Sequence, residues 1–155
     1  MIETRSEIVG ADRNLERLVT EIENAIDELE QAAFLASLVP LEVPPELLEP
    51  LADLSAAGVV ATEAAAAGAA AAGEIPAGHH ADTEDALAAV GRLIEVEHKA
   101  DAAERRMTAR IMTGEYTIKS ALPVLELARA LERSTDRLAT FGHLLHEHVL
   151  ADLAA

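Results

Sequence analysis

The chain has 155 residues, enough for one compact domain with its own core, so we expect residues 1–155 to form a single domain. Half of the residues are apolar, only 2% are aromatic and none is Cys, which excludes disulfides and thiolate metal sites. The formal net charge of −16 argues against binding to nucleic acid or to an anionic membrane surface.

The first half of the chain predicts two helices. Apolar residues at helical spacing predict a helix from about Glu3 to Leu38, which ends before Pro40. Pro45 is well placed to begin a second helix, which extends to about Ala72. Its Ala-rich part is interrupted by polar residues and glycines, so we expect a close-packed buried helix and not a membrane span. The predicted core-facing residues of the first helix are Ile8, Leu15, Leu18, Ile22, Ile26, Leu29 and Ala33.

The second half predicts two more helices. Asp82 or Thr83 can cap a helix that continues to about Met112, after a Gly- and Pro-flanked loop with two histidines, His79 and His80. A fourth helix is expected to begin near Tyr116 to Ser120 and to end near Leu150, with Pro123 in a first turn that begins at Ala121 or Leu122. Long amphipathic segments joined by short connections predict an all-α fold, an up-and-down antiparallel bundle of four long helices.

Three of these predicted helices contain the pattern Glu-x-x-x-Asp. Residues four apart lie one above the other on the same helix face, where two carboxylates repel each other. A metal ion with oxygen ligands is an economical partner for such a pair. The pattern therefore selects six candidate metal ligands, Glu23 and Asp27, Glu97 and Asp101, and Glu132 and Asp136.

The helical period predicts where these acids point. In the third helix, Glu97 and Asp101 are expected within the buried stripe, between Ile94 and Met107 or Thr108. In the fourth helix, Glu132 and Asp136 are expected beside a stripe of Val124, Ala128, Leu131, Thr135, Leu138, Gly142 and Leu145. Glu23 and Asp27 are expected on the flank of the first helix.

Two interpretations of the acids remain open. An acid near a core needs an arginine, a proton or a metal ion as partner, because burying an unpaired carboxylate costs several kcal/mol. Salt bridges between helices are the simpler interpretation, since four arginines are close in sequence. Two motifs on consecutive antiparallel helices favour a metal ion, provided that the motifs lie level with each other. The four arginines are Arg105, Arg106, Arg133 and Arg137.

At these motifs the chain resembles the PhoU-like regulators of phosphate transport, in the form associated with inorganic-phosphate permeases. Val96-Glu97-His98-Lys99-Ala100-Asp101 resembles the family's Leu-Glu-x-Glu-Ala-Asp signature. Leu131-Glu132-Arg133-Ser134-Thr135-Asp136 resembles the partner signature on the family's last helix. Ile22-Glu23-Asn24-Ala25-Ile26-Asp27 looks like part of the family's third helix.

The resemblance implies a helical bundle that binds iron, zinc, manganese or magnesium through these acids, with Glu23 and Asp27 as a weaker set. Family members are regulators or accessory partners of phosphate uptake and are not enzymes, so a phosphate permease or a regulatory protein is the expected partner. The chain lacks counterparts of the family's first two helices, which leaves the first-helix motif without a partner helix. We therefore expect a homodimer, the commonest homo-oligomer.

Other functions stay open at this point. Glu95 and His98 have the Glu-x-x-His spacing of ferritin-like di-iron bundles, although a second such pair is missing. A helical adaptor without metal is a further alternative. The histidines of the last predicted helix, His143, His146 and His148, are most simply explained by the negative end of a helix dipole. A charged segment follows Met1, so we expect a cytoplasmic protein with no membrane insertion.

Overall fold

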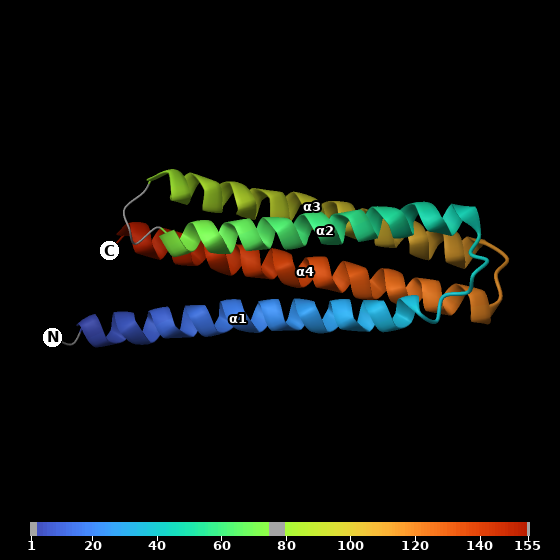
Figure 1. Ribbon diagram of the computed structural model, residues 1–155, viewed down its shortest axis with the longest axis horizontal. Coiled ribbons are helices and arrows are strands. Elements are labelled where there is room, and N and C mark those ends of the chain that lie inside the picture. Colours follow the sequence, from blue (N-terminus) through green and yellow to red (C-terminus); the bar gives the residue numbers. More distant parts are fainter. Residues whose placement is uncertain (1–2, 75–79, 155) are drawn as a thin grey trace.

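The computed structural model describes residues 3–74 and 80–154, with side chains described for residues 13–74 and 82–151. These residues form four long helices and, within the described ranges, no strand (Figure 1). The predicted all-α bundle is therefore confirmed. The helices are α1 (Glu3–Ala36), α2 (Pro45–Glu74), α3 (His80–Thr113) and α4 (Ile118–Ala154).

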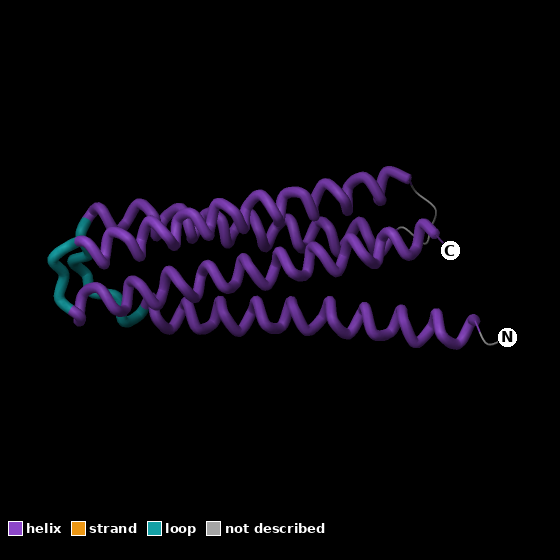
Figure 2. The backbone as a smooth tube through the Cα atoms, turned by 180° about the vertical axis from the view of Figure 1, so that it is seen from behind, coloured by secondary structure: helices purple, strands orange, loops and turns teal. Residues whose placement is uncertain are grey.

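The helices do not pack as a symmetric square. Helices α2, α3 and α4 each contact the other two, whereas α1 packs against α4 alone among the described residues. In Figure 1, α1 accordingly lies as a separate layer below α4. The connections α1–α2 and α3–α4 lie together at one end of the bundle, as Figure 2 shows from behind, and both termini lie at the other end.

Helix α4 begins within the predicted range, whereas helix α3 begins earlier than predicted. Helix α4 starts at Ile118, because the Thr117 hydroxyl accepts a hydrogen bond from the Ser120 backbone N–H over 3.3 Å. This is an N-cap, which places Pro123 in the second turn of the helix and not in the first. Helix α3 starts at His80, so the predicted caps lie inside its first turn. His79 lies outside the described residues.

The core is built largely from alanine and leucine. On α3 the buried residues are small or aliphatic and recur at heptad spacing, so α2 and α4 pack closely against this helix. The predicted placement of Glu97 and Asp101 inside this stripe is wrong. Their side chains are 26% and 30% exposed, because alanines, which are weakly apolar, occupy the positions next to them that face the core. The stripe is Leu93, Val96, Ala100, Ala103 and Met107.

The buried stripe of α1 is narrower than predicted. Leu18, Ala25 and Ala32 are buried against α4, seven residues apart. The predicted core residues Leu15 and Ile26 are instead 59% and 50% exposed. A helix with one packing partner buries one narrow stripe, so the second apolar stripe of α1 stays uncovered. Ile8 lies outside the residues with described side chains.

Helix α2 was predicted to be a buried, close-packed helix, and the structure buries one of its faces and leaves Val59 and Val60 exposed. Leu47, Leu54 and Ala61 are at most 1% exposed, and Gly68 approaches α3 and α4 closely. By length and hydropathy alone, α2 meets the requirement for a membrane span, and 39% of its most apolar window is buried inside the bundle.

Candidate metal centre

An ion pair between α3 and α4 shows that the two acidic motifs lie near each other along the bundle. Arg129 Nε lies 3.8 Å from Glu104 Oε1. The two helices run antiparallel and rise by the same distance per residue. A residue three positions before Glu104 on α3 therefore lies at about the height of the residue three positions after Arg129 on α4. Asp101 therefore lies within about one helical turn of Glu132 along the bundle, and by the same count Glu97 lies within about one turn of Asp136. The two motifs are thus neighbours along the bundle, as the metal interpretation requires.

The acids of this face act on one another electrostatically. Partial burial raises the pKa of Glu132 above its ordinary value, and the negative charges of Asp136, Glu104 and Asp101 raise it further. Arg133 opposes these effects and lowers the same pKa without cancelling them. Two helices thus contribute carboxylates to a region of negative charge centred on Glu132.

Most of the nearby arginines pair with other helices. Arg133 Nε donates to Glu28 Oε2 of α1 over 2.9 Å, and Arg137 Nη1 lies 3.5 Å from Glu21 Oε2 of α1. Arg106 pairs with an acid of α2 and does not face α4. The salt-bridge interpretation of the motifs therefore does not hold for these three arginines.

Two acids of α3, Asp101 and Glu104, do form salt bridges with arginines. Arg105 Nη2 donates to Asp101 Oδ2 over 2.5 Å, within one turn of the same helix. Glu104 is paired with Arg129. Within the described side chains, no salt bridge reaches the carboxylates of Glu132 or Asp136. Among those side chains, both acids of the α4 motif are thus without a salt-bridge partner, and Glu97 of α3 has only His98 beside it.

The carboxylates have not gathered around one point. Among the described residues, no three Asp, Glu or His side chains lie close enough together to hold a metal ion. Glu97 Oε2 lies 3.5 Å from His98 Nε2, and the Asp136 side chain is exposed. The face supplies oxygen donors at similar heights, and their side chains would have to turn inward to share an ion.

The motif of α1 is separate from this face. Glu23 and Asp27 are both exposed, and α1 makes no helix contact with α3 within the described residues. Glu23 lines a groove between α1, α2 and α4. The structure therefore brings together two of the three predicted motifs and leaves the third apart.

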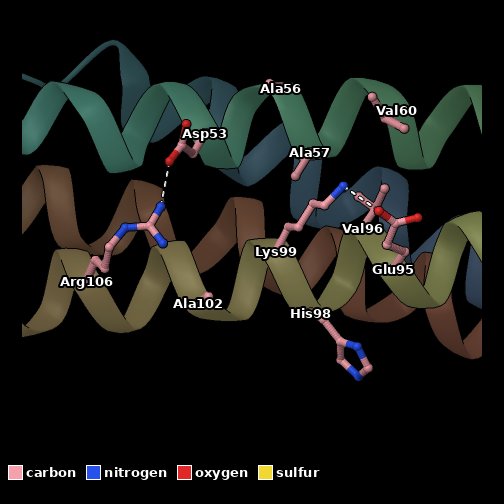
Figure 3. Close-up of a pocket in the computed structure, with 10 residues that line it drawn as sticks. All are labelled: Asp53, Ala56, Ala57, Val60, Glu95, Val96, His98, Lys99, Ala102 and Arg106. Atoms are coloured by element: carbon pink, nitrogen blue, oxygen red, sulfur yellow. Dashed lines mark hydrogen bonds and ion pairs between the residues drawn. The ribbon is translucent and has the colours of Figure 1, made fainter.

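A hollow of about 660 Å³ lies on the other side of α3, toward α2 (Figure 3). Its charged groups are paired: Arg106 bonds Asp53 over 2.5 Å and Lys99 bonds Glu95 over 2.6 Å. His98 projects away from the other labelled side chains, and it is 73% exposed. Glu95 and His98 thus lie at the surface, whereas a ferritin-like di-iron centre needs its ligands inside the bundle.

Glu104 belongs to this face but is not part of any Glu-x-x-x-Asp motif. A usable signal was present, because Glu97, Asp101 and Glu104 follow one another at spacings of four and three residues and so share a helix face. Of the histidines in α4, His143 and His146 are exposed, and His148 lines the same groove as Glu23.

Fold and site together define an all-α bundle with an acidic face shared by two antiparallel helices. No protein-family model, no curated protein and no solved structure matches the chain.

Proposed function

We propose that the protein is a PhoU-like accessory regulator of phosphate transport that binds metal ions on the α3–α4 face and performs no catalysis. The physiological role rests on the resemblance of the three Glu-x-x-x-Asp motifs to that family. The metal site rests on one observation: the α4 acids lie beside the α3 acids, and the two arginines that follow them on α4, Arg133 and Arg137, are engaged with α1. The proposed ligands are Glu97, Asp101, Glu132 and Asp136, joined by Glu104.

The chemistry of this donor set suits a metal ion. Carboxylate oxygens without thiolates favour magnesium, manganese or iron, while zinc also accepts carboxylates. Asp101 would have to leave Arg105, whose side chain is 73% exposed. Exposed pairs within one helix contribute only about 0.3–0.5 kcal/mol, so exchanging this pair for a metal ion costs little.

Metal content measured by mass spectrometry on untagged protein tests the proposal. The isosteric double variant Glu132→Gln/Asp136→Asn removes two charges from the proposed site and keeps its shape. Glu63→Gln/Glu74→Gln, on exposed positions of α2, removes the same number of charges elsewhere. We expect about one or more metal ions per chain in the wild type and the control, and loss of the metal in the site variant.

A metal-free protein with an intact fold would overturn the metal site and leave a helical adaptor as the better description. Thermal unfolding before and after treatment with a chelator provides a second measurement. A ligand bound only by the folded state stabilises it, by about 2.7 kcal/mol at a hundredfold excess over Kd, so removing the metal should lower Tm. An unchanged Tm in a protein that had contained metal would place the ion outside the bundle.

A further inference from the structure

An apolar groove runs between α1 and α2 with α4 as its floor, on a different side of α4 from the acidic face. It contains two pockets of about 370 and 430 Å³. Ile22 lines the first and Leu29 the second, so the pockets are two helical turns apart along α1. On α2 the corresponding residues are Ala69 and Thr62, again seven apart. The two pockets therefore lie in line along the same side of α1 and α2, and together they are called the groove below.

The walls of the groove carry large apolar side chains without a covering helix. Leu15 and Val19 of α1 are 59% and 50% exposed, and Val59 of α2 is 59% exposed. Apart from Val59 and Glu63, the α2 wall is made of small residues. At Gly58 and Gly73, a Cβ atom added to the glycine would have no atom of the described residues within 4 Å. Small residues let a helix backbone approach closely, so the shape of the groove suits a helix.

Apart from His148 of α4, the titratable side chains that line the groove are acidic. Glu23, Asp27 and Glu30 are exposed and follow one another along one face of α1, and Glu63 lines the groove from α2. Helix α2 contains no Lys, Arg or His, and α1 contains none from Leu18 to its end. A cationic occupant is therefore favoured, whereas a second copy of this chain, with a net charge of −16, would bring like charges together.

We propose that this groove binds one amphipathic, basic helix of a partner protein. Apolar side chains seven residues apart would enter the two pockets, and flanking Lys or Arg residues would face the acids of both walls. This is the helix-in-groove mode of recognition, in which the apolar face supplies affinity and the charged flanks select the partner. The Glu-x-x-x-Asp motif of α1 then acts in partner recognition, and the inference does not depend on metal binding at α3–α4.

The probe is a dye-labelled synthetic helix of about 21 residues, with Leu at heptad spacing and Lys on its flanks, titrated by fluorescence anisotropy at physiological salt. Val59 and Val60 form a matched pair, because the first lines the groove and the second lines the hollow of Figure 3 on the other side of α2. We expect Val59→Gln to weaken binding about tenfold, which corresponds to about 1.4 kcal/mol, and Val60→Gln to change it less than twofold.

Charge is tested in the same titration. Glu63→Gln should weaken binding about two- to threefold, while Glu74→Gln, which removes an equal charge outside the groove, should not. A peptide with the same Leu pattern and Glu in place of Lys should bind at least tenfold more weakly. Thermal unfolding of each variant verifies that the fold is retained.

Three outcomes would overturn the proposal. Equal effects of Val59→Gln and Val60→Gln would show that the peptide binds the acidic surface without using the groove. Equal binding of the Lys and Glu peptides would remove the basis for a basic partner. A dimer in sedimentation equilibrium at micromolar concentration that dissociates on Val59→Gln would identify a second copy of the chain as the occupant.

Discussion

Arg133 of α4 donates from Nε to Oε2 of Glu28 on α1 over 2.9 Å, although it is the residue next to Glu132. A second arginine one turn further along α4, Arg137, pairs with Glu21 of α1. Helix α1 thus holds the cations that would otherwise neutralise the α4 motif. The structural helix and the proposed metal site are therefore electrostatically connected.

Because of this connection, we expect Glu28, which is not a proposed ligand, to influence metal binding. Glu28→Gln should free Arg133 to turn toward Glu132, which would lower the pKa of Glu132 and compete with the metal. We expect metal affinity to fall about fivefold, equivalent to about 1 kcal/mol, in a titration followed by calorimetry. Glu49→Gln, which releases Arg110 on α2–α3 instead, is the control and should leave affinity unchanged. Unchanged affinity in Glu28→Gln would mean that Arg133 does not reach the site.

The raised pKa of Glu132 predicts how the metal-free protein responds to pH. Between the pKa of the unfolded chain and the higher pKa of the folded one, the folded state binds more protons, so this group makes stability fall as pH rises. Glu132→Gln removes the penalty that is present at neutral pH. In a chelator we expect its Tm to exceed that of the wild type by about 2 °C at pH 7, with the difference vanishing near pH 4.

Other carboxyls do not interfere with that comparison. Hydrogen bonds and nearby cations lower the pKa of Glu46, Glu49 and Glu95, and their contribution to stability is lost as pH falls. Because these groups are present in both proteins, their effects cancel in the difference between the two Tm values. A difference that did not depend on pH would attribute the effect of the variant to packing and not to charge.

The close approach of α2 to its neighbours predicts opposite results for two glycines. A Cβ on Gly68 would lie 2.9 Å from Leu145 Cδ2 and 3.1 Å from Ala89 Cβ, whereas nothing lies within 4 Å of one on Gly58. Ala in place of Gly within a helix stabilises by about 0.5–1 kcal/mol, while overpacking a core costs about 1–3 kcal/mol. Urea unfolding should therefore find Gly58→Ala more stable than Gly68→Ala by roughly 2 kcal/mol. Equal stabilities would mean that α2 and α3 can separate at no cost.

In the described part of the chain, helix α1 has one neighbouring helix, so we expect it to open before the rest of the bundle. It packs against α4 alone among the described residues, while α2, α3 and α4 support one another. Regions with fewer buried contacts open locally with lower free energy than the global transition. In native-state hydrogen exchange we expect the amides of residues 18–32 to be at least tenfold less protected than those of residues 124–145. A tenfold difference in protection corresponds to a difference of roughly 1.4 kcal/mol in the free energy of opening. Equal protection in both stretches would show that the four helices unfold as one unit.

The sequence by itself determined the number, order and approximate ends of the helices. Proline and glycine near residues 40–45, 73–78 and 114 interrupt the helical pattern, and such local signals act without tertiary contacts. The start of α3 was predicted late, and Pro123 was assigned to the first turn of α4, although the Thr117 cap starts that helix at Ile118 and leaves Pro123 in the second turn. The buried stripe of α4 was also predictable, since this helix packs against all three others.

Tertiary structure alone decided which apolar stripes are covered and which charges are compensated. Leu15, Leu18 and Ile26 are equally apolar in the sequence, and only the presence of a single neighbouring helix separates the buried residue from the two exposed ones. Likewise, the local sequence places Arg133 beside Glu132, but its partner Glu28 is 105 residues away. Helical periodicity is a local property, whereas the choice of partner depends on which helices meet, and that is fixed by packing of the whole chain.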